Sequence, residues 1–257
     1  MKNIVKIKRA LISVYDKSLL KNLLPILSKY KIEIISSGKT YKKIKKLGFK
    51  NIKISNFTKS NEILDGRIKT LHPKIHAGIL NIRKNINHKM DLIKNNFEEI
   101  DLVIVNFYPF ENIIKKKNFK NIIENIDIGG PALVRSAAKN FYDVLVVVNP
   151  ENYIHAINEM NKYKGSTSLK FRKQKAKNSF NEIANYDSMI PNYFNDKFNV
   201  KFPNKKTFTG KLIKKLRYGE NPHQKAAIYS NGNNLNIRQL NGKKLGFNNY
   251  NYIFSAL

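Results

Sequence analysis

The segment from Asp101 to Asn106 constrains the fold more than any other part of the sequence. Its central residues are Leu-Val-Ile-Val, which are apolar without the alternation expected of a strand that has one wet face. Strands that are apolar on both faces are typical of parallel sheets covered by helices on each side. The segment therefore predicts an inner strand of a parallel sheet.

Strand patterns and helix patterns alternate along the first 160 residues. Strands are predicted at 10–14, 32–35, 52–54 and 144–148. Helices are predicted after Ser18, up to Leu47, and over 91–100, 112–125, 131–140 and 151–160. This alternation indicates an α/β fold with a mainly parallel sheet flanked by helices.

The pattern changes after residue 168. A helical extension without strands runs to about 193, and the next stretch is polar and interrupted by Pro203. We therefore expect a first domain over 1–194, a linker over 195–210, and an incomplete second domain over 211–257.

The charge balance allows two interpretations. A net charge of +30 is ordinarily a sign of a polyanionic partner such as nucleic acid. The lysines are spread along the whole chain, however, and the abundance of Lys, Asn and Ile resembles a compositional bias towards A+T codons. The dispersion favours the bias, and no specific nucleic-acid partner is predicted.

Composition also excludes several kinds of chemistry. The chain has no cysteine, so disulfides, thiolate metal sites and thiol nucleophiles are ruled out. There is neither an N-terminal signal pattern nor an apolar run of eighteen residues, so we expect a cytoplasmic protein that does not contact membranes.

Polar clusters follow the predicted strands or precede a predicted helix. They are Ser13–Lys17, Ser36–Thr40, Asn106–Tyr108 and Asp127–Gly130. Ligands of parallel α/β sheets bind beyond the carboxyl ends of the strands, where helix N-termini offer free N–H groups. With the cation-rich stretch Asp65–Gly78, these clusters predict one shared site for an anionic ligand.

The same clusters carry a resemblance. The motifs are SVYDK at 13–17, SGKT at 37–40, DGRIKTLHP at 65–73, NFYPF at 106–110, NIDIGGP at 125–131 and RSAAKN at 135–140. In this order and spacing they resemble the bifunctional purine biosynthesis proteins, which join an IMP cyclohydrolase domain to an AICAR formyltransferase domain. The resemblance implies a first domain similar to methylglyoxal synthase.

The implied reaction is the closure of FAICAR to IMP with loss of water, which needs neither metal nor cofactor. The resemblance implies Lys69, Tyr108, Asp127 and Lys139 as catalytic residues. We assign Asp127 as the base that removes the carboxamide proton, and the other three as donors to the formyl oxygen. These roles can be permuted among the four.

The resemblance also implies the residues that bind the substrate. They are Ser13, Lys17, Ser37, Gly38, Lys39, Thr40, Arg67, Thr70, Asn106, Phe107, Ile128, Gly129 and Gly130. Two positions depart from the family, because Lys39 replaces a usual glycine and Tyr15 replaces a frequent serine. Lysine adds strain if that glycine has a positive φ, and attraction if it faces phosphate.

The segment RYGENPHQ at 217–224 resembles the opening of the formyltransferase domain, with Arg217, Tyr218 and Asn249 implied as nucleotide contacts. The sequence ends before the folate-contacting segments. We therefore expect no transfer from 10-formyltetrahydrofolate unless another polypeptide supplies them. Besides a purine ribonucleotide substrate, two protein partners are possible: a second copy of this chain or a separate formyltransferase polypeptide.

Other interpretations stay open on the residues alone. The chain could be an inactive nucleotide-binding module of the same fold, or a basic nucleic-acid-binding protein. His72 and His76 have the i, i+4 spacing of metal ligands, but no third ligand is evident, so we interpret them as structural. We expect Lys74 and the lysine runs at 42–46 and 115–117 to be solvated.

Overall fold

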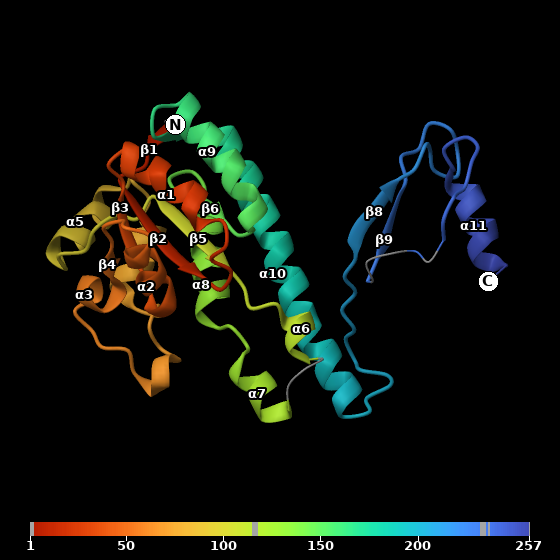
Figure 1. Cartoon of the computed structure of the whole chain (residues 1–257), viewed down its shortest axis with the longest axis horizontal. Helices are drawn as coiled ribbons and strands as arrows, with labels where there is room; N and C mark the ends of the chain where they lie inside the picture. The colour runs from red at the N-terminus through yellow and green to blue at the C-terminus, as the bar shows by residue number, and fades with distance from the viewer. Residues whose placement is uncertain (1–2, 115–117, 232–234, 236, 257) are drawn as a thin grey trace. The chain divides into compact units, whose positions relative to one another are not determined.

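The computed structural model describes residues 3–114, 118–231, 235 and 237–256. It divides the chain into two compact units, Met1–Tyr186 and Asp187–Leu257, which we describe separately. Helix α10 (Leu169–Lys197) runs through this boundary as one continuous helix (Figure 1). The predicted division at residue 194 stays a prediction.

The first unit is built on a five-stranded parallel sheet. Its strands are β2 (Arg9–Val14), β3 (Glu33–Ser36), β4 (Ile52–Lys53), β5 (Leu102–Asn106) and β6 (Leu145–Val147), in the order β4-β3-β2-β5-β6. All five residues of β5 are buried, as the unbroken apolar segment predicts. The predicted α/β fold is confirmed.

The strand order changes direction at β2, because β3 and β4 lie on one side of it and β5 and β6 lie on the other. Strand β3 pairs with one side of β2, and β5 pairs with the other side in the register Val14↔Asn106. A crevice beyond the carboxyl ends of two such strands is the usual ligand site of an open α/β sheet. We therefore expect the ligand site among the residues that follow Val14 and Asn106.

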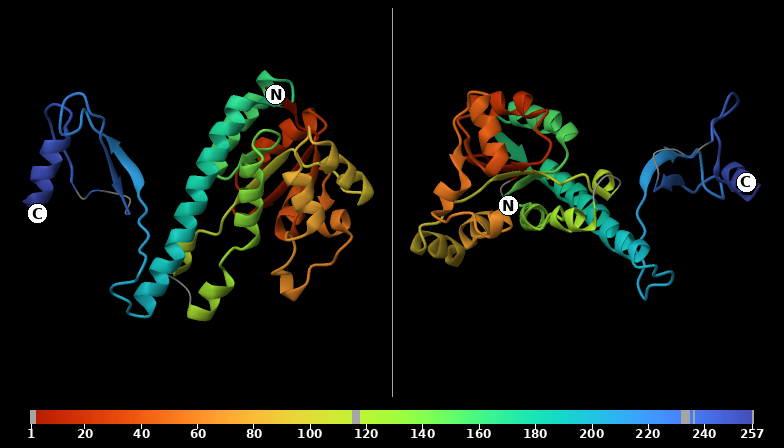
Figure 2. Two further views of the ribbon diagram at one scale, coloured as in Figure 1. Left: turned by 180° about the vertical axis from the view of Figure 1, so that it is seen from behind. Right: turned by 60° about the horizontal axis from the view of Figure 1, so that its bottom comes forward.

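Alternate residues of each strand enter two separate cores. Ile12 of β2 packs against α1 (Leu20–Lys29), α2 (Gly38–Lys46) and α9 (Tyr153–Lys162). Leu11 packs on the opposite face against α3 (Ile54–Thr58), α4 (Pro73–Leu80), α8 (Gly129–Lys139) and α10. Figure 2 shows these helices arranged around the sheet. Burial on both faces explains why the strands lack a polar alternation.

Several local predictions need correction. Helix α1 begins at Leu20 without a side-chain cap, so Ser18 is not its N-cap. The helix expected over 91–100 is α5 (Ile86–Lys94). The helix expected over 112–125 is replaced by α6 (Phe110–Ile114) and α7 (Phe119–Glu124). The lysine run 115–117 lies outside the described residues.

Short elements complete the first unit. Strand β1 (Ile4–Lys6) pairs antiparallel with β7 (Ser166–Ser168), away from the main sheet. The 3-10 turns η1 (Leu64–Gly66) and η2 (Pro150–Asn152) precede α4 and α9 in the chain. In the second unit, β8 (Lys211–Lys215) pairs antiparallel with β9 (Ala227–Ser230), and α11 (Phe247–Ser255) follows.

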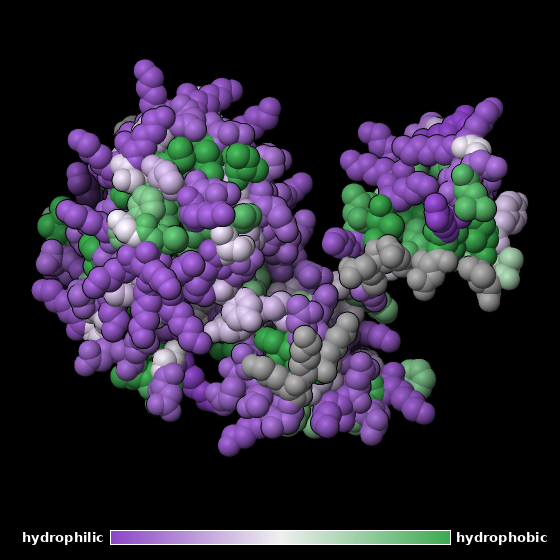
Figure 3. Space-filling view, viewed as in Figure 1, coloured by the Kyte–Doolittle hydropathy of each residue, from purple (hydrophilic) through white to green (hydrophobic). Residues whose placement is uncertain are grey.

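The surface is largely hydrophilic on the face of the first unit that Figure 3 shows. The run at 42–46 on α2 fits this description, because its lysines are exposed or half-buried. Lys74 does not, since it is buried with its Nζ 4.6 Å from the centre of the Phe57 ring and 3.8 Å from Glu98 Oε2. Its prediction as a solvated residue is wrong. Across the described residues, no helix is long and apolar enough to cross a membrane.

Candidate functional site

Asn106 at the end of β5 holds the loop that follows β2. Its Oδ1 accepts the N–H groups of Tyr15 (2.7 Å) and Asp16 (2.9 Å), and its Nδ2 donates to the Asp16 carbonyl (3.1 Å). These three bonds are possible because Val14 and Asn106 are partners across the two strands. Asn106 is buried, and its amide fixes the backbone of the loop at Tyr15 and Asp16.

The carboxyl ends of β2 and β3 are joined by hydroxyl groups. The Ser13 and Ser37 oxygens lie 2.7 Å apart, and Thr40 Oγ1 bonds both the N–H (3.1 Å) and the carbonyl (3.0 Å) of Val14. Thr40 is buried, so its hydroxyl is committed to the backbone. Ser37 precedes α2 and leaves the helix N-terminus as a donor surface.

Gly38 and Lys39 form the first turn of α2. Gly38 has φ +42°, the left-handed region that glycine tolerates best, whereas Lys39 is absent from the residues with positive φ. Lys39 therefore adds no left-handed strain. Its side chain is exposed at the helix N-terminus, where its positive charge can attract a phosphate.

Three ammonium groups converge on this edge of the sheet. Lys17 is half-buried and donates to the Tyr15 carbonyl at 2.6 Å. Burial lowers the pKa of Lys17, and the nearby charges of Lys39 and Lys69 lower that pKa further, against the opposing effect of Asp16. Mutual repulsion among three cations favours the binding of an anion between them.

Asp127 lies two residues before the start of α8, and hydrogen bonds hold it from two sides. Its Oδ1 accepts the N–H of Gly130 at 2.8 Å, and its own N–H donates to the Tyr186 hydroxyl at 2.7 Å. Burial raises the pKa of Asp127, although the Gly130 hydrogen bond and the Lys69 charge oppose the rise. A carboxylate with a raised pKa is a better proton acceptor than an ordinary surface aspartate.

The two glycines that begin α8 allow close packing around Asp127. A Cβ at Gly130 would lie 2.4 Å from Asp127 Oδ2, and a Cβ at Gly129 would lie 2.4 Å from Thr70 Oγ1. Thr70 is buried and follows Lys69 in the cation-rich stretch. The glycines therefore bring this stretch and Asp127 against the start of the same helix.

Aromatic side chains line the same region. The rings of Tyr15 and Tyr108 are 4.7 Å apart, and those of Phe107 and Tyr186 are 5.1 Å apart. Burial raises the pKa of Tyr108, and the charge of Asp127 adds to that rise, which keeps the phenol protonated as a donor. The structure thus brings Lys69, Tyr108 and Asp127 together.

Three further predicted site residues are exposed. Lys139 is exposed at the last position of α8, ten residues beyond Gly129 and therefore roughly 15 Å along the helix axis. Arg67 is exposed and bridges to Glu124, with Nε 3.2 Å from Oε2. Ile128, between Asp127 and Gly129, is 62% exposed.

The histidines of the cation-rich stretch have local partners. His72 Nδ1 accepts the N–H of Lys74 at 3.1 Å and caps α4, and His76 Nδ1 lies 2.9 Å from Ser136 Oγ. Burial lowers the pKa of His76. Among the residues that the structure describes, no three His, Cys, Asp or Glu side chains are grouped to hold a metal.

The residues implied in the second domain also lie close together. The Arg217 guanidinium is 5.3 Å from the centre of the Tyr218 ring, and that ring lies against Gly246. Asn249 Oδ1 accepts the N–H of Gly246 at 3.0 Å, at the start of α11. Gly246 therefore links Tyr218 to Asn249 within the second unit.

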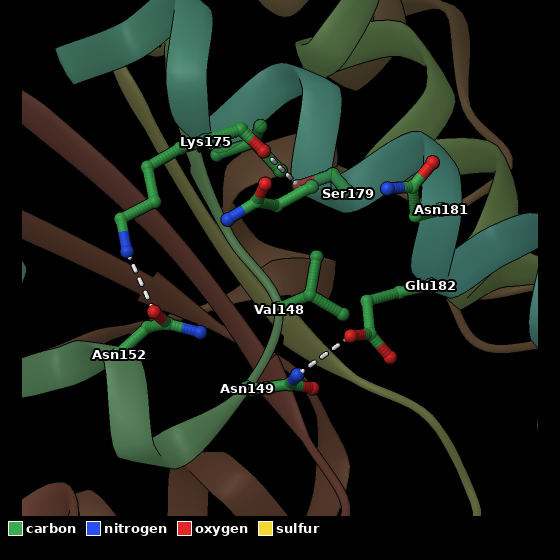
Figure 4. A pocket seen from close by; sticks show the side chains of 9 residues that line it. Val148, Asn149, Asn152, Lys175, Ser179, Asn181 and Glu182 are labelled. Carbon is green, nitrogen blue, oxygen red and sulfur yellow. Dashed lines mark hydrogen bonds between the residues drawn. The ribbon is translucent and has the colours of Figure 1, made fainter. Parts of the chain in front are cut away.

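Two features were missed by the sequence reasoning. Tyr186 supports Asp127 from α10, and its only sequence signal is its place in the buried face that includes Ala176 and Ile183. A separate pocket of about 220 Å³ adjoins the end of β6 and α10 (Figure 4). No motif marks this pocket.

Comparisons with known proteins cover nearly the whole chain. A family model described as AICARFT/IMPCHase bienzyme matches residues 137–257, and one described as MGS-like domain matches residues 20–132. Bifunctional purine biosynthesis protein PurH of Bradyrhizobium diazoefficiens is 44% identical over 96% of this chain and 47% of that protein. PurH of Ruminiclostridium cellulolyticum is 46% identical over 95% of this chain and 49% of that protein.

The fold has a solved counterpart. The crystal structure of ForH matches with a TM-score of 0.64 and 26% identity, over 73% of this chain and 98% of that chain. The chain spans about half the length of the curated relatives it matches.

Proposed function

The chain belongs to the AICARFT/IMPCHase bienzyme family, and on that premise we propose that its first domain closes FAICAR to IMP with loss of water. One observation carries this proposal. Lys39 lies in the first turn of α2, its charge and that of Lys69 both act on Lys17, and the Lys69 charge also acts on Asp127, whose pKa burial raises. The site thus combines an anion subsite with a base.

The anion subsite suits the phosphate of a purine ribonucleotide. We place the phosphate at Ser37, Gly38 and Lys39, where backbone N–H groups and the helix dipole favour a dianion. Lys17 adds a second cation from the neighbouring strand end. The Ser13 hydroxyl, which bonds Ser37, orients that side of the subsite.

The reacting atoms then fall near Asp127. The carboxamide nitrogen attacks the formyl carbon while Asp127 accepts its proton, and negative charge builds on the formyl oxygen. Lys69 and Tyr108 are the donors that stabilise this oxygen. The oxygen takes up two protons and leaves as water, and the ring C=N bond forms as the former formamide nitrogen gives up its proton.

Lys139 takes no part in this proposed step. The family resemblance implies a catalytic role, but its position at the far end of α8 favours a role away from the formyl group. Arg67 is paired with Glu124 in this structure. We propose that it contacts the substrate after this ion pair opens on binding.

The second activity of the family is proposed more narrowly. Formyl transfer in this family uses 10-formyltetrahydrofolate as co-substrate. We propose that Arg217, Tyr218 and Asn249 belong to the nucleotide subsite of that transfer, since they lie close together in the second unit. The remainder of that subsite would come from the half of the relatives that this chain does not span.

The test is turnover of FAICAR followed by absorbance, without folate. The parent chain should form IMP, and Lys69→Met should lower kcat/KM by about 100-fold or more, the usual cost of removing one oxyanion donor. Lys46→Met, at an exposed position of α2, is the control and should leave the rate unchanged. Nucleotide binding by the parent without IMP formation would instead identify an inactive binding module.

A further inference from the structure

The pocket of about 220 Å³ beside β6 is lined by none of the residues assigned to the proposed nucleotide site. It lies between the residues that follow β6 and the helix α10, and four asparagines are among the residues that line it (Figure 4). Pockets for drug-sized ligands usually measure roughly 300–1,000 Å³. This pocket therefore suits a smaller, polar molecule.

Lys175 forms one end of the pocket, and none of the described carboxylates pairs with its ammonium group. The residue is only 5% exposed; its Nζ donates to Asn152 Oδ1 at 2.6 Å and lies 5.2 Å from the centre of the Phe171 ring. In the described part of the chain, Lys175 takes part in no ion pair. Burial lowers the pKa of Lys175 accordingly. Buried charges are normally paired, so an anion at this position would supply the missing partner.

Glu182 forms the other end of the pocket. It accepts the Asn149 side-chain N–H at 2.9 Å and lies seven residues after Lys175, so both project from the same face of α10. Between them, the Ser179 hydroxyl donates to the Lys175 carbonyl at 2.9 Å and keeps lone pairs for a ligand. The pocket thus offers a cation at one end, acceptors in the middle and a carboxylate at the other end.

We propose that this pocket binds a small amino acid, with its carboxylate on Lys175 and a nitrogen donor on Glu182. The amide groups of Asn149 and Asn152 complement such a molecule, because each can donate or accept. A dianion would meet repulsion at Glu182, and a simple amine would meet repulsion at Lys175.

Calorimetric titration of the full chain tests the proposal, with L-glutamine, glutarate and n-butylamine as probes. L-Glutamine should bind more tightly than glutarate, and n-butylamine should not bind. Lys175→Met should weaken glutamine binding by about tenfold or more, the effect of losing one charge-assisted hydrogen bond. Lys173→Met, an exposed position on the same helix, is the matched control and should bind like the parent.

A second variant covers the case in which Lys175→Met does not fold. Asn178→Asp keeps Lys175 and places a carboxylate on the pocket wall, so it should weaken glutamine binding by a similar factor. Circular dichroism confirms the fold of each variant. The proposal is overturned if glutamine fails to bind the parent at millimolar concentration, if glutarate binds more tightly, or if both pocket variants bind like the parent.

Discussion

Replacing Gly130 by alanine separates two effects that act in opposite directions. In a helix, alanine in place of glycine stabilises by roughly 0.4–1 kcal/mol where the backbone conformation allows it. Gly130 has no positive φ, so its backbone accepts alanine. Propensity alone would therefore make Gly130→Ala a mildly stabilising change.

The new Cβ would instead displace the proposed base. It would lie 2.4 Å from Asp127 Oδ2, 2.9 Å from Cγ and 3.0 Å from Oδ1. Since a comfortable C···O contact is about 3.3 Å, the nearer oxygen must move by about 0.9 Å. Rotation of the carboxylate does not solve this, because all three atoms are too close. A misplacement near 1 Å can cost about 100-fold in rate, or about 2.7 kcal/mol of transition-state stabilisation.

We therefore expect Gly130→Ala to lower kcat for FAICAR closure by about 100-fold and to reduce the free energy of unfolding in urea. In the background Asp127→Ala the clashing atoms are absent, so the same change should raise stability by up to about 1 kcal/mol. A rate within about threefold of the parent would refute the reasoning. So would an equal stability change in both backgrounds.

Two further changes test the site and its support. Burial raises the pKa of Asp127, so the folded protein binds the carboxyl proton more tightly than the unfolded chain does. Folding stability therefore falls as the pH rises from the pKa of Asp127 in the unfolded chain to its higher pKa in the folded protein. Asp127→Asn keeps an oxygen that can accept the Gly130 N–H, so urea unfolding at pH 7 should show a stability equal to or higher than that of the parent, while activity is lost. In the parent, the rate of FAICAR closure should fall on acidification, with a midpoint above the ordinary pKa of aspartate. Arg172→Met should lower the unfolding free energy by about 3 kcal/mol, because buried Arg172 donates to the carbonyls of Phe141, Tyr142 and Thr167, which would lose their partner. Lys173→Met is its control and should change stability by less than about 0.5 kcal/mol.

The sheet could be predicted because its signal is local. The apolar run before Asn106 needs burial on both faces, and only a parallel sheet between helices provides it. The clusters at the strand ends could be placed together for the same reason, since parallel strands bring their carboxyl ends to one edge. Lys69, Tyr108 and Asp127 follow from these two steps and from the family motifs.

The features that could not be predicted depend on contacts between distant segments. Lys74 resembles any lysine in a basic chain, and only the fold brings Phe57 and Glu98 to it. Lys139 lies in a motif beside other predicted site residues, and its catalytic role stays a prediction; the structure adds that it is exposed at the last position of α8. Tyr186 has no motif at all, and its bond to Asp127 joins residues 59 positions apart in the chain.

That bond also bears on how the gene can be rearranged. Asp127 lies within the segment matched by the MGS-like model, whereas Tyr186 lies within the segment matched by the bienzyme model. A hybrid joined between residues 132 and 137 would take the base from one parent and its support from another. The two matched segments are separate in the sequence. Recombination between them should nevertheless be tolerated only when both parents share Tyr186 and the geometry of α10.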